Sequence, residues 1–168
     1  YLSANENSNL IFFLEDIVHQ TAHNILNTAL FFKKEELFTV SPESTINDSI
    51  LEGDHRDLFG VFHGLFTQSC INLFFDTLID KEVFKSLELY EIKGRLSDNM
   101  KRWESSLSIF QNSNILTDLG EFFFDEFVEI YEKINQKIGN IIYKYDTSNQ
   151  PYIFNYEEFL KLNPHEEA

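Results

Sequence analysis

The sequence predicts a mainly α-helical fold in a single domain. The 168 residues include only three Pro and six Gly, which argues against a loop-rich β fold. Apolar side chains recur every three or four residues over several long segments, the period of one helix face. The length suits one domain with a sizeable core. We expect that domain to span residues 1–168, and a start at Tyr1 without Met leaves open that they are the C-terminal part of a longer chain.

The net charge argues against some classes of partner, and the cysteine content excludes an internal disulfide. The formal net charge is −15, and no basic stretch is present, which argues against nucleic-acid and acidic-membrane binding. The single cysteine, Cys70, excludes an internal disulfide and reads as a small core residue. We expect Asp, Glu and Lys to interrupt the apolar runs before they reach the length of a membrane span. The default expectation is therefore a cytoplasmic protein.

The first helix is expected to run from Ser8 or Asn9, either of which could cap it, to about Phe32. A loop over residues 33–57 follows, broken by Ser41-Pro42. Because this loop comes directly after the first helix, we expect it to shape a functional site.

Three more long helices are expected at about residues 57–79, 81–110 and 118–138. Thr117 should cap the last of them, and Gly139-Asn140 should end it. We expect a short extended segment and one helical turn after it.

Two glycines fall inside these expected helices. Gly64 costs its helix ~1 kcal/mol relative to alanine, so we expect a helix or a ligand to approach the backbone there. Gly94 is expected to bend the third helix.

A pair of histidines in the first helix is the main chemical signal. His19 and His23 are four residues apart, so both rings lie on one face, where they can grip one metal ion. The pattern is that of H-E-x-x-H, except that Gln20 replaces the glutamate that acts as general base in zinc peptidases. A neutral amide cannot take the proton, so metal binding could survive this change and peptidase chemistry should not. Two ordinary half-buried histidines are the alternative interpretation.

A third histidine, His63, lies near the start of the second predicted helix. Taken alone, it would be a core histidine with a hydrogen-bond partner. Together with the first pair it makes a three-imidazole site, which suits zinc, iron, copper or nickel. Glu43, Asp48 and Asp54 are candidate carboxylate ligands, or partners that orient an imidazole.

Several short blocks occur in an order that resembles a known family, the HExxH-motif proteins encoded near ribosomal-peptide modification genes. Members of this family are iron(II)- and 2-oxoglutarate-dependent peptide β-hydroxylases. The blocks cover about residues 17–125. They are His19-Gln20-Thr21-Ala22-His23, Ser41-Pro42, Asp54-His55-Arg56-Asp57-Leu58, Val61-Phe62-His63-Gly64, Arg95, and Ile115-Leu116-Thr117-Asp118-Leu119-Gly120.

The resemblance implies a role for each matching residue. His19, His23 and His63 would bind iron, and Arg56 would hold 2-oxoglutarate through a bidentate guanidinium–carboxylate pair. A structural ion pair of Arg56 with Asp54 or Glu52 is the alternative. Gln20 departs from the family motif and is expected to lie next to the metal ligands without binding the metal itself.

We therefore expect a metal site between the first two long helices and a dioxygenase that hydroxylates the β-carbon of a peptide side chain. The acidic chain suggests a basic peptide as substrate. One alternative is a catalytically silent module that binds a leader peptide or a partner protein. Another is a zinc hydrolase or an inactive relative of one, with zinc in place of iron.

Overall fold

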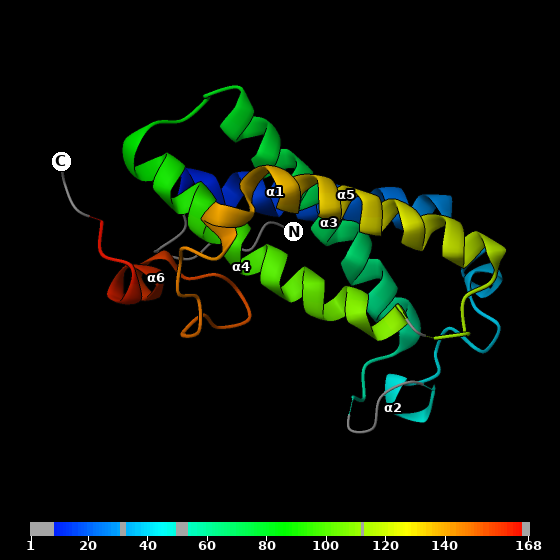
Figure 1. Ribbon diagram of the computed structural model, residues 1–168. Helices are drawn as coiled ribbons and strands as arrows, with labels where there is room; N and C mark the ends of the chain where they lie inside the picture. Colours follow the sequence, from blue (N-terminus) through cyan, green and yellow to red (C-terminus); the bar gives the residue numbers. More distant parts are fainter. Residues whose placement is uncertain (1–8, 31–32, 50–53, 112, 166–168) are drawn as a thin grey trace.

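The fold is a bundle of long α-helices with a short helix near its C-terminal end (Figure 1). The computed structural model describes residues 9–30, 33–49, 54–111 and 113–165. It confirms the mainly helical single domain expected from the sequence. The elements are α1 (Leu10–Ala29), the 3₁₀ helix η1 (Lys34–Leu37), α2 (Ile46–Ser49), α3 (Leu58–Asp80), α4 (Ser86–Phe110), α5 (Asp118–Ile142) and α6 (Tyr156–Leu162).

Side-chain caps determine where three of the long helices begin. Asn9, Asp57 and Thr117 stand directly before α1, α3 and α5, and each accepts a hydrogen bond from the backbone N–H three residues later. Such a cap typically stabilises a helix by ~1 kcal/mol. The caps predicted at Asn9 and Thr117 are confirmed; Ser8 and the predicted helix end at Phe32 lie outside the described residues.

Helix α3 is the centre of the bundle and contacts α1, α4 and α5. Phe62 on α3 is fully buried, and its ring meets those of Phe38, Phe110 and Phe127 edge-on at centroid distances of 5.3–6.1 Å. Edge-to-face pairs of this kind add to the stabilisation from apolar burial. The phenylalanine-rich composition thus supplies the contacts that hold α3, α4 and α5 together.

The central position of α3 also explains its composition. Residues 58–75 contain no Asp, Glu, Lys or Arg, so the expectation that charges interrupt every apolar run does not hold here. Within the described residues, α3 is the one helix long and apolar enough to cross a membrane on length and composition, with a mean hydropathy of 1.3. Half of that apolar window is buried by the rest of the bundle.

Two helix ends differ from the sequence prediction. Helix α4 begins at Ser86 rather than at residue 81, because Glu82 has a φ of 51°, outside the helical region; Ser86, the first residue of α4, has the same φ. Helix α5 continues past Gly139 to Ile142. Ile142 is 2% exposed, and its carbonyl accepts a hydrogen bond from the Ser97 hydroxyl, so tertiary packing extends the last turn.

The two glycines singled out in the sequence have different surroundings. A Cβ built on Gly94 would lie 2.6 Å from the ring of Phe159, so this glycine makes room for α6. A Cβ built on Gly64 would meet no heavy atom within 4 Å. No other helix therefore approaches the backbone at Gly64 in the described structure, and the space beside it is open.

The segment between α1 and α3 is tied to the bundle at both ends. Phe38 forms an isolated β-bridge with Leu116, and Thr45 forms one with Asp57. Gly120 in the first turn of α5 lets the backbone of η1 approach closely. The segment expected to be loop thus contains η1 and α2, and it links the starts of α3 and α5.

Candidate metal centre

The side chains of His19, His23 and His63 meet where α1 packs against α3. Nε2 of His23 lies 2.7 Å from Nε2 of His19. Nδ1 of His23 lies 2.8 Å from Nε2 of His63. The structure thus brings together the three histidines selected from the sequence, with His23 between the other two.

Local sequence places each ring. His19 and His23 lie on successive turns of α1 at the edge of its buried stripe, which includes Ala22 at 2% and Leu26 at 1% exposure. His63 lies one turn after Phe59 on α3, and the Phe59 ring stacks on it at a centroid distance of 5.6 Å. All three histidines are half-buried, so the group is accessible from solvent while packed against both helices.

Burial and repulsion between the rings disfavour the charged forms of His23 and His63. Burial, together with the charges that His19 and His63 would carry, lowers the pKa of His23 to about 4. Burial, followed by the effect of His19, also lowers the pKa of His63. At neutral pH the His23 ring has one N–H and one bare nitrogen, so it donates to one neighbour and accepts from the other.

The three imidazoles fit a divalent transition metal in chemistry and proximity. Ligand nitrogens must be unprotonated, which the lowered pKa values favour. Two nitrogens on one tetrahedral ion, each at ~2.0–2.1 Å, lie ~3.3 Å apart, which is about 0.5 Å farther than the 2.7 and 2.8 Å between the rings here.

The present ring orientations are nevertheless those of a hydrogen-bonded chain. One ion takes one nitrogen from each ring, whereas His23 turns a different nitrogen to each neighbour. In the described part of the chain, no three His, Cys, Asp or Glu side chains stand ready to hold an ion. Metal binding at these residues therefore requires the His23 ring to reorient.

Gln20 lies beside His19 on α1, and its amide donates to Oδ1 of Asp16 at 3.2 Å. This hydrogen bond joins it to a carboxylate one turn earlier and not to an imidazole. Because an amide does not accept a proton at neutral pH, Gln20 offers no general base at the position of the motif glutamate.

Arg56 is paired with Asp54 just before α3. Nε and Nη2 of Arg56 donate to the carboxylate at 3.0 and 2.6 Å, which lowers the pKa of Asp54 and raises that of Arg56. The structural pairing considered for Arg56 is thus present, and Glu52 lies outside the described residues. The Arg56 side chain is 55% exposed and that of Asp54 is 15% exposed, so exchange of Asp54 for another carboxylate would leave the largely buried Asp54 carboxylate without this partner.

The other candidate carboxylates have partners of their own or cannot be placed. Glu43 accepts hydrogen bonds from Lys34 and from Ser41, and these lower its pKa to about 2. The side chain of Asp48 lies outside the described residues. The described contacts thus connect neither carboxylate to the histidines.

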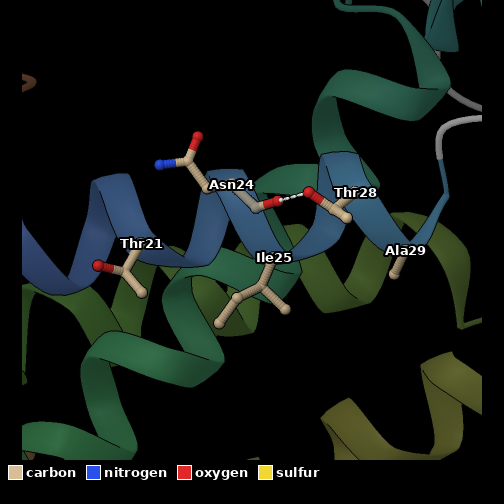
Figure 2. A pocket seen from close by; sticks show the side chains of 5 residues that line it. All are labelled: Thr21, Asn24, Ile25, Thr28 and Ala29. Carbon is tan, nitrogen blue, oxygen red and sulfur yellow. Dashed lines mark hydrogen bonds between the residues drawn. The ribbon is translucent and has the colours of Figure 1, made fainter.

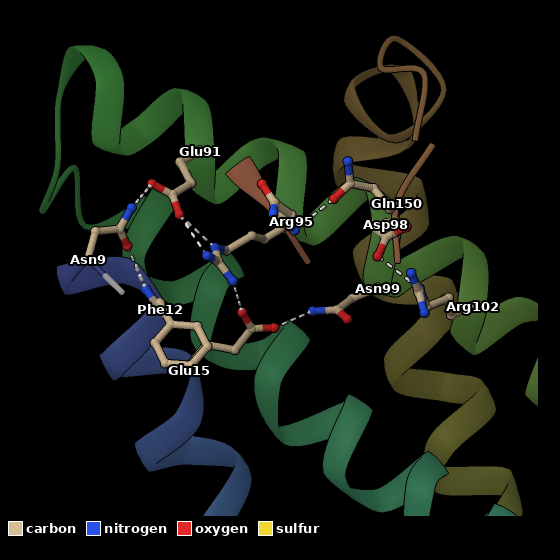
Figure 3. Close-up of polar contacts among 10 residues, drawn as sticks. Asn9, Phe12, Glu15, Glu91, Arg95, Asp98, Asn99, Arg102 and Gln150 are labelled. Carbon is tan, nitrogen blue, oxygen red and sulfur yellow. Dashed lines mark hydrogen bonds and ion pairs between the residues drawn. The ribbon is translucent and has the colours of Figure 1, made fainter. Parts of the chain in front are cut away.

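A second polar group lies one turn before the first histidine of α1 (Figure 3). The Arg95 side chain is 4% exposed and donates to Glu15 at 2.5 Å and to Glu91 at 2.8 Å. Asn9 and Asn99 donate to the remaining oxygens of these carboxylates. Buried charges are tolerated when they are paired and hydrogen-bonded in this way. The group joins α1 to α4 and so holds the helix that carries two of the histidines.

No family model, no curated protein and no solved structure matches this chain. The site is therefore assessed from its own residues. Two of the contacts around it were not predicted from the sequence. Phe59 is four residues before His63, and the i,i+4 rule could have found it. The contact of Glu15 with Arg95 spans 80 residues, and no local pattern indicates it.

Proposed function

We propose that this chain binds iron(II) through His19, His23 and His63 and acts as a 2-oxoglutarate-dependent dioxygenase on a peptide side chain. The convergence of three half-buried imidazoles from α1 and α3 carries the metal-binding part of the proposal. The reaction class, hydroxylation at a β-carbon, rests on the resemblance of the sequence blocks to the peptide β-hydroxylases.

The protein groups have limited tasks in such a reaction. The three rings bind as neutral ligands, which the low pKa of His23 favours. With dioxygen as the oxidant and 2-oxoglutarate as the co-substrate that is oxidised, bound iron would supply the oxidising chemistry, so the reaction needs no side-chain base, and Gln20 is compatible with it. Arg56 releases Asp54 and pairs instead with a carboxylate of 2-oxoglutarate.

Charge supports a basic peptide as the substrate, and the surface at Gly64, the residue after His63 on α3, is open, because a Cβ built there would meet no heavy atom of another part of the chain within 4 Å. The net charge of −15 would attract a basic segment toward the protein.

The first experiment is anaerobic loading with iron(II) and 2-oxoglutarate, followed by visible absorption spectroscopy. We expect a charge-transfer band of the chelated co-substrate that is lost in His23→Ala and in Arg56→Ala. His55→Ala is the matched control, because His55 is exposed, lies next to Arg56 and makes no contact with the three rings. A band that survives His23→Ala would refute these ligands.

A second candidate function follows from the hydrogen bonds among the rings. They satisfy His23 without a metal, as expected if the histidines only join α1 to α3 in a silent peptide- or protein-binding module. Absence of the band, with iron not retained, would favour this module. Tight retention of zinc would instead favour a disabled hydrolase, whose activity should appear only in Gln20→Glu.

A further inference from the structure

The three rings of the candidate metal centre are not equivalent. His19 and His63 each turn Nε2 toward His23, at 2.7 and 2.8 Å. His23 turns Nε2 to the first and Nδ1 to the second. Because one ion takes one nitrogen from each ring, His19 and His63 already present theirs to the middle of the group, and His23 is the ring that has to turn. Such a centre needs a contact that keeps His63 in place while His23 turns.

The surface hollow on α1 lies on the other side of this helix from the rings. It has a volume of about 480 Å³ and is lined by Thr21, Asn24, Ile25, Thr28 and Ala29 (Figure 2). At about 100° per residue, Thr21 and Thr28 are on the opposite side of the helix from His19 and His23. The hollow therefore provides no room for the His23 ring, whose movement takes place in the contact between α1 and α3.

Phe59 lies between His63 and the core of the bundle. Its ring stacks on the His63 ring at a centroid distance of 5.6 Å and an interplanar angle of 24°. Phe59 is half-buried and packs against the main hydrophobic core. Offset aromatic pairs at centroid distances of ~4.5–7 Å attract each other beyond the effect of apolar burial. The stack thus joins the His63 ring to the fixed part of α3.

A turn in the segment before α3 holds the backbone of Phe59. The carbonyls of Pro42 and Ser44 accept hydrogen bonds from the N–H groups of Phe59 and Leu58, each at 3.0 Å. These N–H groups belong to the first turn of α3, where a helix offers no carbonyl of its own. The segment between α1 and α3 therefore fixes the position from which the Phe59 ring reaches His63.

We propose that Phe59 is a positioning residue of the histidine site. It keeps the His63 ring with Nε2 toward α1, so that His63 is the preset ligand and His23 is the ring that turns when a metal binds. This inference rests on the proposed metal centre and assigns different tasks to its ligands. A ligand that is held in place before binding loses less conformational freedom, which is worth roughly two- to tenfold in affinity for one side chain.

Titration of the full chain with cobalt(II), followed by visible absorption, tests the effect on metal binding. Phe59→Leu removes the ring but keeps an apolar side chain, and should weaken cobalt binding by roughly two- to tenfold. Phe59→Tyr keeps the flat ring and should retain most of the wild-type affinity. Phe66→Leu is the matched control, because Phe66 is half-buried on the same helix and its ring packs against that of Phe127.

NMR of the ring protons and nitrogens tests the positioning itself. In the metal-free chain we expect a nuclear Overhauser effect between the rings of Phe59 and His63. This effect should persist after addition of zinc, which is diamagnetic, whereas the ring signals of His23 should change. In Phe59→Leu without metal, the His63 ring signals should broaden or average, because the ring is no longer held in one orientation.

The outcomes separate the positioning role from the metal centre. A wild-type chain that binds neither cobalt nor zinc refutes the metal centre itself. Equal cobalt affinity in wild type and Phe59→Leu, or an equal loss in Phe66→Leu, keeps the metal centre and overturns the role of Phe59. Loss of the contact between Phe59 and His63 on addition of zinc likewise overturns it, because His63 would then not be the preset ligand.

Discussion

His23 is the residue on which the candidate site depends, because it contacts both other rings. Its pKa is about 4 in the folded chain and close to 6.5 when unfolded. Between these values the unfolded chain takes up a proton that the folded chain refuses, so stability is present at pH 7 and falls as the pH is lowered toward 4. After allowance for solvent screening, the loss for the metal-free protein should be on the order of 1–2 kcal/mol.

Urea unfolding at pH 7 and pH 5 in the presence of a chelator would measure this loss. His23→Gln should flatten the pH dependence in that window, whereas the exposed His55→Gln should keep it. Equal pH dependence in wild type and His23→Gln would contradict the prediction.

Asn72 is a second residue with an unusual environment. It is completely buried on α3, and neither atom of its amide has a hydrogen-bond partner. Such a group typically costs ~1–3 kcal/mol, so Asn72→Leu, which keeps the number of side-chain atoms, should raise the free energy of unfolding by a similar amount. Chemical denaturation would measure the change. A large decrease would instead show that the amide binds an internal water.

At the scale of elements, Gly94 and Gly64 allow a comparison between a crowded and an open glycine position in two helices. Gly94→Ala would push a methyl group into the Phe159 ring and should lower stability by ~1–3 kcal/mol, with easier proteolysis of the segment around α6. Gly64→Ala meets open space and should raise stability by ~0.5–1 kcal/mol. Thermal unfolding and limited proteolysis of both variants provide the comparison. Equal effects of the two substitutions would mean that the packing of α6 on α4 does not decide the outcome.

The elements also show what local sequence can predict. Asn9 and Thr117 marked helix starts correctly because a cap acts within three residues. The extension of α5 to Ile142 was missed because that turn is stabilised by burial against distant residues. In the site, the proximity of His19 and His23 could be predicted from their helical spacing. The presence of His63 beside them was indicated only by its order among the other sequence blocks.

At the scale of the whole molecule, the histidines connect two helices that do not follow each other directly in the chain. His19 and His23 are on α1 and His63 is on α3, so a metal held by all three would cross-link the two helices in the folded state alone. A ligand of the folded state stabilises it by ~2.7 kcal/mol at one hundred times its dissociation constant. Iron(II) or zinc should therefore raise the unfolding midpoint of the entire chain, and a chelator should reverse the increase.

Replacement of His63 distinguishes this linkage from metal binding by α1 alone. If all three rings bind one ion, His63→Ala should abolish most of the metal-dependent increase, because two imidazoles on one helix do not join α1 to α3. His165→Ala provides the control, since His165 lies against Tyr90, outside the three-histidine group. Scanning calorimetry under anaerobic conditions, with and without iron, would measure both. An undiminished increase in His63→Ala would restrict the metal to the His19 and His23 pair and remove α3 from the site.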